Sequence, residues 1–428
     1  MRTVVSFAPF GQGTALTLVE APVSIPGVGI PEFTELPVPV GTLSERGRVL
    51  RDLLALHPSV GQGMASAVAL PAGAAPNPLY FHVVSDRADE LPWEELFDPE
   101  NGFLALDSRW PIGRIAKVVR PVPARSFVPP LRIVAVLSAA REDGTNQLKG
   151  LLRAATTPAA ASIGVHVHVI SAQEAVLDAV HTAGLAEVSA EVLPATAPEL
   201  EGRITAARPH LLHLLCHGGA VAGVRTLAFA HTGDFEAEAP TGSVLLKLPQ
   251  LVNVLKPSAA WLVVLCACQS AEAADGPALA HDLVSNGIAA VAGMRRMVDL
   301  RDTDRFCAAL YPEVLAAVGR AVADGPQEER EIDWAAAFTA PRVVLAGADP
   351  EQFDAWTDPV LYVQRNPLTV FPGSPKLSPA DFATLHGVLD FWEEFVARFD
   401  PATADPALLA HAKARIAAVR AQLAEEET

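Results

Sequence analysis

The chain has 428 residues, of which 50% are hydrophobic and 19% are charged, and its net charge is -17. This composition excludes a disordered chain and a coiled coil, and the length allows two domains or one large α/β domain with additions. The negative charge argues against direct nucleic-acid binding, which needs a basic surface.

The four cysteines, Cys216, Cys266, Cys268 and Cys307, are too few for a disulfide framework in a chain of this length. The first residues lack the apolar core and small-residue cleavage site of a secretory signal. The longest apolar stretch, AAWLVVLCAC, is too short to cross a bilayer. We therefore expect a cytoplasmic protein with reduced thiols and no membrane partner.

Residues 1–120 are predicted to form an N-terminal β-rich region. The runs VVSFA and TALTLVE read as a hairpin across the turn PFGQG. A short helix is expected over 46–57 and a strand over 80–86. The Pro-rich segment VRPVPARSFVPP then marks a linker.

Residues 131–372 are predicted to form the main domain, because apolar runs alternate there with helical patterns. Continuous apolar strands that alternate with helices indicate a mostly parallel sheet covered by helices on both faces. The expected strands are 132–140, 165–171, 209–219, 259–270, 288–294 and a last one over 356–364, and the clearest helical windows are 172–184 and 278–288.

Residues 373–428 are predicted to form a C-terminal helical extension with windows over 380–399 and 406–427. The second window has one apolar stripe with residues three or four apart. The stripe either packs on the chain's own main domain, which is the ordinary outcome for a surface helix, or docks an activator or a second copy. Its residues are Leu409, Ala412, Ile416, Val419 and Leu423.

A histidine and a cysteine stand at the ends of two apolar strands. His217 is followed by two glycines, and Cys268 is followed by Gln269 and Ser270. Active sites of open parallel sheets form beyond the carboxyl ends of the strands, so the two side chains are expected to face each other. They are 51 residues apart, close to the separation of about 50 residues from histidine to cysteine in caspases.

This pair has the chemistry of a cysteine protease. A thiolate attacks a peptide carbonyl, and a neighbouring imidazole favours the thiolate or protonates the leaving amine. The tetrahedral oxyanion needs backbone N–H donors, for which the amides of Gly218 and Cys268 are the predicted oxyanion hole.

Other histidines and cysteines nearby have simpler interpretations. His213 lies deeper in its strand and is expected to be structural, while Cys266 sits one pleat back from Cys268 as a small buried hydrophobe. Cys216 and Cys307 are predicted to be core residues. The set His213, Cys216, His217, Cys266 and Cys268 has enough ligands for a zinc ion. Structural zinc ligands usually come from turns, however, whereas these side chains lie on strands and point to opposite faces. We expect no metal and no cofactor.

The sequence around these residues resembles the CHAT family, a branch of the caspase-like, separase-related cysteine peptidases. The matching segments are LLHLLCHGG, LVVLCACQSAEAADGPALAHDLVSNGIAAVAGMRRMV, FCAALYPEVL and LPWEELFDPENGFLAL, within residues 80–365. In this family the dyad histidine precedes a glycine, like His217, and the nucleophile follows an alanine, like Cys268. The resemblance implies a caspase-like α/β fold and favours Cys268 over Cys266. Gln269 replaces the arginine or glycine of animal caspases, so cleavage after aspartate is not assumed.

The resemblance also implies a regulated endopeptidase with a protein substrate, acting as an effector in a bacterial defence or cell-death pathway. No sensor is visible in the sequence, so the trigger is expected to come from an activator protein in trans, from the N-terminal β-rich region or from the C-terminal helices. The isolated chain should be nearly inactive. The loops expected to become ordered on activation are 219–245 and 269–277. The alternative is a non-catalytic interaction module that keeps the fold. A nucleotide-binding protein ranks last, because no phosphate-binding glycine motif follows a strand.

Overall fold

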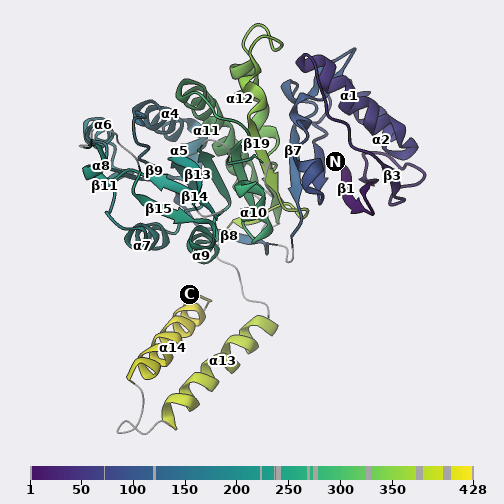
Figure 1. Ribbon diagram of the computed structural model, residues 1–428. Helices are drawn as coiled ribbons and strands as arrows, with labels where there is room; N and C mark the ends of the chain where they lie inside the picture. The colour runs from purple at the N-terminus through teal and green to yellow at the C-terminus, as the bar shows by residue number, and fades with distance from the viewer. Residues whose placement is uncertain are drawn as a thin grey trace. The chain divides into compact units, whose positions relative to one another are not determined.

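The computed structural model in Figure 1 describes residues 2–71, 73–118, 122–221, 224–235, 237, 242–267, 270–272, 278–323, 329–372, 379–398 and 406–426. Its strands are β1 Thr3–Phe10, β2 Gly13–Glu20, β3 Glu32–Thr34, β4 Leu79–Val83, β5 Phe97–Asp98, β6 Gly102–Phe103, β7 Ile112–Ala116, β8 Arg125–Phe127, β9 Leu131–Leu137, β10 Val165–Ser171, β11 Val188–Val192, β12 Leu211–Leu215, β13 His217–Val221, β14 Val224–Phe229, β15 Val244–Lys247, β16 Leu262–Cys266, β17 Ala290–Met294, β18 Arg330–Glu331, β19 Pro359–Val363 and β20 Thr369–Pro372.

The helices are α1 Leu43–Leu56, α2 Pro58–Val68, α3 Asp86–Asp89, α4 Thr145–Ala155, α5 Pro158–Ile163, α6 Glu174–Ala183, α7 Ala197–Ala207, α8 Thr232–Phe235, α9 Leu248–Ser258, α10 Leu279–Ser285, α11 Leu300–Val322, α12 Ala336–Ala346, α13 Pro379–Ala397 and α14 Pro406–Glu426, with short 3-10 turns η1 Trp93–Glu95, η2 Leu104–Leu106 and η3 Asp354–Thr357. A local sequence signal explains where α1 begins. Thr42 caps α1 through a reciprocal capping box with Glu45, in which each side chain accepts from the other residue's backbone N–H.

A 12-stranded sheet organises the main unit, in the order β11-β10-β9-β12-β16-β17-β19-β7-β4-β1-β2-β3. The first six strands of this order, β11, β10, β9, β12, β16 and β17, are parallel to one another. β19 runs antiparallel to β17 and parallel to β7, which continues in parallel to β4 and β1. The sheet therefore has two mainly parallel halves of opposite direction, and the prediction of a mostly parallel α/β sheet is confirmed.

Helices cover both faces of the half formed by β9 to β17. One layer contains α4, α5 and α11, which pack on one another, and the other contains α7, α9 and α10 (Figure 1). The central strands are buried along their whole length, as in β12 and β16. Burial on both faces explains why these strands read as continuous apolar runs rather than as alternating patterns.

The N-terminal region contributes strands to this same sheet. The predicted hairpin is present, because β1 pairs antiparallel with β2, and the helix expected over 46–57 is α1. The strand expected to be last, β19, lies inside the sheet between β17 and β7, not at an edge. Residues 1–125 and 129–370 consequently form one compact unit, although the predicted domain boundaries themselves stay predictions.

A buried ionic cluster anchors the segment LPWEELF. The guanidinium of Arg114 on β7 donates to the carboxylate of Glu94 at 2.6 Å and to that of Asp89 at 3.1 Å. Burial acts to raise the pKa of Glu94, but the charge and hydrogen bond of Arg114, with the charges of Arg342 and Arg295, together outweigh it and lower that pKa below its usual value. The acidic residues of this segment are therefore structural, because their charges are satisfied inside the core.

The second compact unit comprises 126–128 and 371–428, and its main feature is the α13–α14 hairpin. Arg420 on α14 pairs with Glu393 on α13 at 2.6 Å, and the rings of Trp392 and His411 are in contact across the helices. In the predicted stripe, Ala412 and Val419 are buried, Leu409 and Ile416 are half-buried, and the side chain of Leu423 lies outside the described residues. The docking of this hairpin on the main domain or on a partner stays a prediction.

Candidate functional site

The carboxyl ends of four parallel strands meet at one edge of the sheet. Leu215 at the end of β12 is in register with Leu137 at the end of β9 and with Cys266 at the end of β16. β17 runs parallel beside β16 and ends at Met294. The residues that follow these strands therefore share a small region, as the parallel arrangement predicts.

His217 lies at this edge, two residues beyond the end of β12. The chain bends at Cys216, and His217 begins β13, which pairs antiparallel with β14. Its side chain is half-buried, and Nε2 lies 2.6 Å from the carbonyl oxygen of Ala140, just after β9. A carbonyl only accepts, so Nε2 carries the proton and donates it. Nδ1 is then a lone-pair acceptor, and it makes no hydrogen bond to another described residue.

This contact orients the imidazole as a base should be oriented. The Ala140 carbonyl selects the tautomer with Nδ1 free, and its negative dipole would stabilise a positive ring after proton uptake. No side-chain type marks this partner, because the acceptor belongs to the backbone. The only hint in the sequence is that residue 140 ends the strand predicted over 132–140.

The predicted nucleophile, Cys268, lies outside the described residues, as does Gln269. The residues on either side are held at the same edge. Ala267 is buried directly after β16, and the Ser270 hydroxyl accepts from the N–H of Met294 at 2.9 Å. Ala271 donates its own N–H to the Met294 carbonyl at 2.8 Å. The assignment of Cys268 stays a prediction, while the described residues before and after it are held in place by burial and by hydrogen bonds.

The predicted oxyanion hole is described only in part. Gly218 lies on β13 opposite Leu227 of β14, while the second proposed donor, the amide of Cys268, lies outside the described residues. At Gly219, an added Cβ would meet nothing within 4 Å, so a substrate can approach this backbone closely. The role of these amides stays a prediction.

A small cavity of about 40 Å³ opens beside His217. It lies between the ends of β9, β12 and β16 and the start of α11, and its lining is half polar and half apolar. The lining residues are Ala139, Glu142, Leu215, Cys216, His217, Cys266, Val298, Leu300 and Thr303.

His213, four residues before His217, lies in a fully satisfied hydrogen-bond chain. Gln147 uses its amide nitrogen to donate to the Thr303 hydroxyl at 3.1 Å, so its oxygen must accept from Nε2 of His213 at 2.8 Å. Nδ1 of His213 then accepts from the Tyr311 hydroxyl at 2.7 Å. Burial lowers the pKa of His213 to about 3. Both ring nitrogens are therefore engaged, and this histidine is structural, as predicted.

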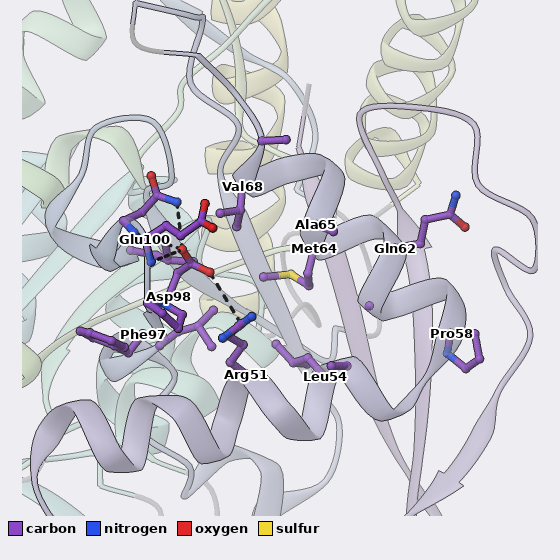
Figure 2. Close-up of a pocket in the computed structure, with 17 residues that line it drawn as sticks. Arg51, Leu54, Pro58, Gln62, Met64, Ala65, Val68, Phe97, Asp98 and Glu100 are labelled. Atoms are coloured by element: carbon purple, nitrogen blue, oxygen red, sulfur yellow. Dashed lines mark hydrogen bonds and ion pairs between the residues drawn. The ribbon is translucent and has the colours of Figure 1, made fainter.

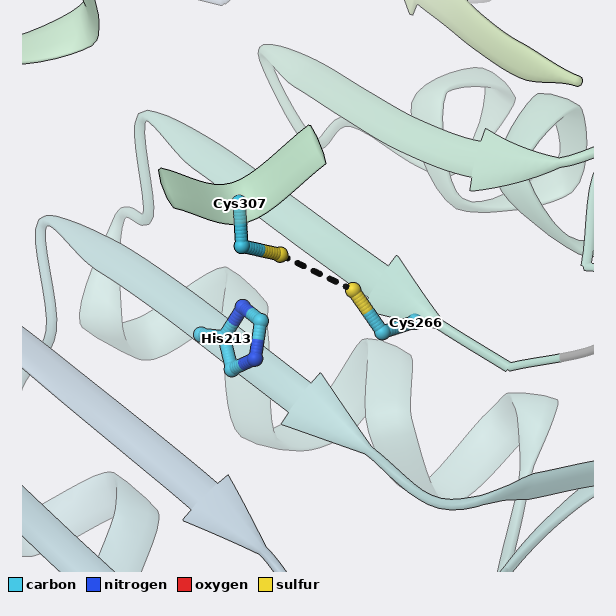
Figure 3. A group of neighbouring side chains, drawn as sticks. All are labelled: His213, Cys266 and Cys307. Carbon is cyan, nitrogen blue, oxygen red and sulfur yellow. Dashed lines mark hydrogen bonds between the residues drawn. The ribbon is translucent and has the colours of Figure 1, made fainter. Parts of the chain in front are cut away.

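Two cysteines lie against His213. The sulfur of Cys266 is 3.4 Å from the sulfur of Cys307 on α11, and both side chains are buried, as was expected of them (Figure 3). Burial is the main cause that raises the pKa of Cys307 well above its usual value, and the hydrogen bond between Cys307 and Cys266 adds to it, so this thiol keeps its proton.

The same three side chains place their ligand atoms within 4.8 Å of one another, which raises the question of a metal. The residues fit a metal ion poorly. Both nitrogens of His213 are committed to Gln147 and Tyr311, and metal binding requires a deprotonated thiolate and a free imidazole lone pair. This set differs from the five possible zinc ligands named from the sequence, because it includes Cys307. That residue lies on a helix distant in the chain, and sequence spacing could not associate it with the strands.

A larger pocket of about 720 Å³ lies elsewhere, between α1, α2 and the residues from Leu96 to Leu104 (Figure 2). Arg51 and Asp98 face each other across it at 3.6 Å, and Met64 points into it. No histidine or cysteine is among the described residues that line it. It offers space for a ligand, but it lacks a nucleophile and a base for peptide cleavage.

The two segments predicted as switch loops are only partly described. Residues 219–245 contain β14 and α8 as well as parts of β13 and β15, so the described part is largely regular structure, and the expectation of a loop is wrong there. Backbone pairing with His217 and Gly218 explains this, because β13 needs β14 as its partner. In 269–277, only Ser270, Ala271 and Glu272 are described.

Within the described residues, no helix is long and apolar enough to span a membrane. A family model described as the CHAT domain matches residues 47–329, which is more than half of the chain. No curated protein matches the sequence.

Proposed function

Because the chain belongs to the CHAT domain family, we propose that it is a regulated cysteine endopeptidase in which His217 and Cys268 form the catalytic dyad. The proposal includes a protein substrate cleaved in a cytoplasmic, reducing environment, and a role as an effector in a bacterial defence or cell-death pathway. It includes neither a metal nor a cofactor, and no direct contact with nucleic acid or membrane.

One observation carries the proposal. The imidazole of His217 is held by the Ala140 carbonyl at 2.6 Å with Nδ1 left as an acceptor, at the edge where β16 leads into Cys268. A histidine kept only for packing would have both nitrogens satisfied inside the core, as His213 does. The orientation of His217 suits a base that receives a proton from a neighbouring thiol.

The reaction follows from these atoms. Nδ1 of His217 takes the proton of Cys268, and the thiolate sulfur attacks the scissile carbonyl carbon. The carbonyl oxygen becomes an oxyanion that backbone N–H groups, including that of Gly218, stabilise. The imidazolium, stabilised by the Ala140 carbonyl, then protonates the leaving amine as the C–N bond breaks. Water hydrolyses the thioester, with His217 accepting its proton, and the free thiol returns.

Activation is proposed to come from a protein in trans. An open cysteine protease would damage its host, and a bound partner can order loops beside the dyad. The segment 269–277 directly follows the nucleophile and is the better of the two candidates. Purified chain alone should therefore have little activity, and strong activity without partner or processing would contradict this part of the proposal.

The alternative is a non-catalytic interaction module with the same fold. The two functions differ in a single measurement, namely cleavage that depends on Cys268. The chain should be incubated with the products of its neighbouring genes, with and without candidate triggers. Cys268→Ala should abolish cleavage, while Cys266→Ala, a matched substitution two residues earlier in the chain, should retain it. Unchanged cleavage by Cys268→Ala would refute the dyad, and the same partners bound without any cleavage would favour the interaction module.

A further inference from the structure

The thiols of Cys266 and Cys307 form a close pair of oxidisable groups that the proposed mechanism does not use. Their sulfurs are 3.4 Å apart, although they come from β16 and α11 and are 41 residues apart in sequence. A disulfide bond is about 2.05 Å long, so a closing movement of little more than 1 Å would join them. We propose that this pair is an oxidation site that closes to a disulfide when the protein meets a small peroxide.

The cavity beside His217 provides the access that a buried cysteine normally lacks. Fully enclosed cysteines are inert, but Cys266 lines this cavity of about 40 Å³ together with His217 and the hydroxyl-bearing Thr303. About 15 Å³ of such space suffices for one water molecule, so the cavity has room for hydrogen peroxide, with two oxygen atoms. Glutathione disulfide and other large oxidants are too big to enter. The expected oxidant is therefore hydrogen peroxide.

One molecule of hydrogen peroxide accounts for both steps of disulfide formation. The Cys266 sulfur attacks a peroxide oxygen, so that an S–O bond forms and the O–O bond breaks, and the departing hydroxide leaves as water with the thiol proton. The Cys307 sulfur then attacks the sulfenic sulfur, forming the S–S bond and releasing a second water with its own proton. Two thiols lose two electrons, and one peroxide is reduced to two waters.

The surroundings favour the second step over further oxidation. Cys307 lies beside the sulfur that becomes a sulfenic acid, and an intramolecular thiol at this distance reacts before a second peroxide arrives. Burial keeps Cys307 protonated, so Cys266, which lines the cavity, is the thiol that reacts first with the peroxide. His213 takes no part as a base, because Gln147 and Tyr311 occupy its nitrogens.

The disulfide has a consequence that rests on the proposed function. Cys266 ends β16 two residues before Cys268, and Cys307 belongs to the helix whose first turn supplies Leu300 and Thr303 to the cavity. The cross-link would tie the strand that leads to the nucleophile to this helix and draw both toward each other. Oxidation should therefore lower the reactivity of the dyad, and reduction by a dithiol should restore it.

The chemical test does not depend on protease activity. Full-length Cys268→Ala protein, which lacks the nucleophile, is treated with increasing hydrogen peroxide, quenched, alkylated in denaturant and digested for mass spectrometry. We expect a disulfide-linked fragment containing Cys266 and Cys307. The link should vanish in Cys307→Ala and persist in Cys216→Ala, which removes another cysteine of the same cavity lining. Recovery of both cysteines as free thiols at every peroxide dose that leaves the circular dichroism spectrum unchanged would overturn the proposal.

The regulatory consequence is tested separately with Cys268 present. Triggered protein is oxidised and then labelled at Cys268 with a peptide-based electrophile, beside a Cys307→Ala control that cannot form the link. Cys268 in the linked protein should be labelled about tenfold less than in the control, a ratio within the range of coupling between neighbouring sites. Dithiothreitol should remove this difference. Equal labelling after a proven link would overturn the regulatory consequence, and failure to label Cys268 in either unoxidised protein would instead refute the proposed function.

Discussion

Two histidines that are four residues apart, one on β12 and one at the start of β13, have opposite environments. His213 lies within β12, is 1% exposed, and shares both ring nitrogens with Gln147 and Tyr311. His217 lies past the bend at Cys216, is half-buried, and has one nitrogen bound to a backbone carbonyl and the other available. The same side chain is thus a structural bridge inside the sheet and a candidate base at its edge. What separates the two roles is the end of the strand.

A comparison of two of the cavities teaches a related lesson. The pocket of about 720 Å³ beside α1 and α2 has no histidine or cysteine in its lining, while the cavity of about 40 Å³ beside His217 has one histidine and two cysteines. Size measures room for a ligand, whereas chemistry needs a nucleophile and a base within reach. The smaller cavity is therefore the better guide to the reacting centre.

The largest expected effect is the loss of catalysis in His217→Ala. Removing a general base typically lowers the rate by about 10²–10⁴-fold, and the half-buried ring contributes one hydrogen bond, so the melting temperature should change little. Triggered cleavage and thermal unfolding measured on the same preparation check this. A strongly lowered melting temperature would place His217 with the structural histidines and remove the contrast.

The converse substitution, His213→Ala, should mainly destabilise the fold. It leaves a cavity and removes the hydrogen-bond partner of two buried side chains, Gln147 and Tyr311. Together these losses should lower the unfolding free energy by about 3 kcal/mol. Urea unfolding gives this value. If His213→Ala instead abolished cleavage with its unfolding free energy intact, the roles of the two histidines would be reversed.

The pH dependence of stability gives a further test of the structural role of His213, because deep burial holds this ring neutral. Its pKa is lowered to about 3 by burial, against about 6.5 in an unfolded chain. Above pH 6.5 the ring is neutral in both states and contributes no pH dependence. Below it, the unfolded chain binds a proton that the folded chain cannot, so stability falls by about 1.4 kcal/mol per pH unit from this group.

Urea unfolding at pH 7.5 and pH 5 (roughly one unit above and one and a half below the usual histidine pKa) measures this fall. The matched variant is His213→Gln, and the difference between the two proteins cancels the contributions of other titrating groups. The difference in unfolding free energy should shrink by about 2 kcal/mol toward acid. Parallel pH profiles for the two proteins would mean that His213 is protonated in the fold.

The smallest expected effect comes from Tyr311→Phe. This substitution removes only the hydroxyl that donates to Nδ1 of His213 at 2.7 Å, leaving one buried acceptor unsatisfied, at a cost of about 1–2 kcal/mol. Triggered cleavage should be unchanged, since the ring of Tyr311 keeps its place on α11. A loss of cleavage without a loss of stability would connect this network to the dyad directly.

The sequence predicted the central half of the sheet well, for a physical reason. Strands buried on both faces read as continuous apolar runs, and the carboxyl ends of parallel strands meet, so the region around His217 could be located from pattern alone. The bend at Cys216 could not, because LLHLLC continues the apolar run and only pairing with β14 separates β13 from β12.

Long-range contacts limited the rest. The pairing of β19 with β7 joins segments more than 200 residues apart, and local patterns carry no trace of it. The Ala140 carbonyl is a backbone group that any residue could supply. Cys307 was recognised as a core residue, but its contact with Cys266 depends on how α11 crosses the sheet.

The most direct test of the dyad is the site and rate of thiol labelling in triggered protein treated with a peptide-based electrophile. Mass spectrometry assigns the adduct to one of the four cysteines. The account predicts modification of Cys268, slowed by at least about 10²-fold in His217→Ala, because the thiolate then lacks its base. Labelling at Cys266 or Cys307, or an equal rate of Cys268 labelling without the His217 imidazole, would contradict it.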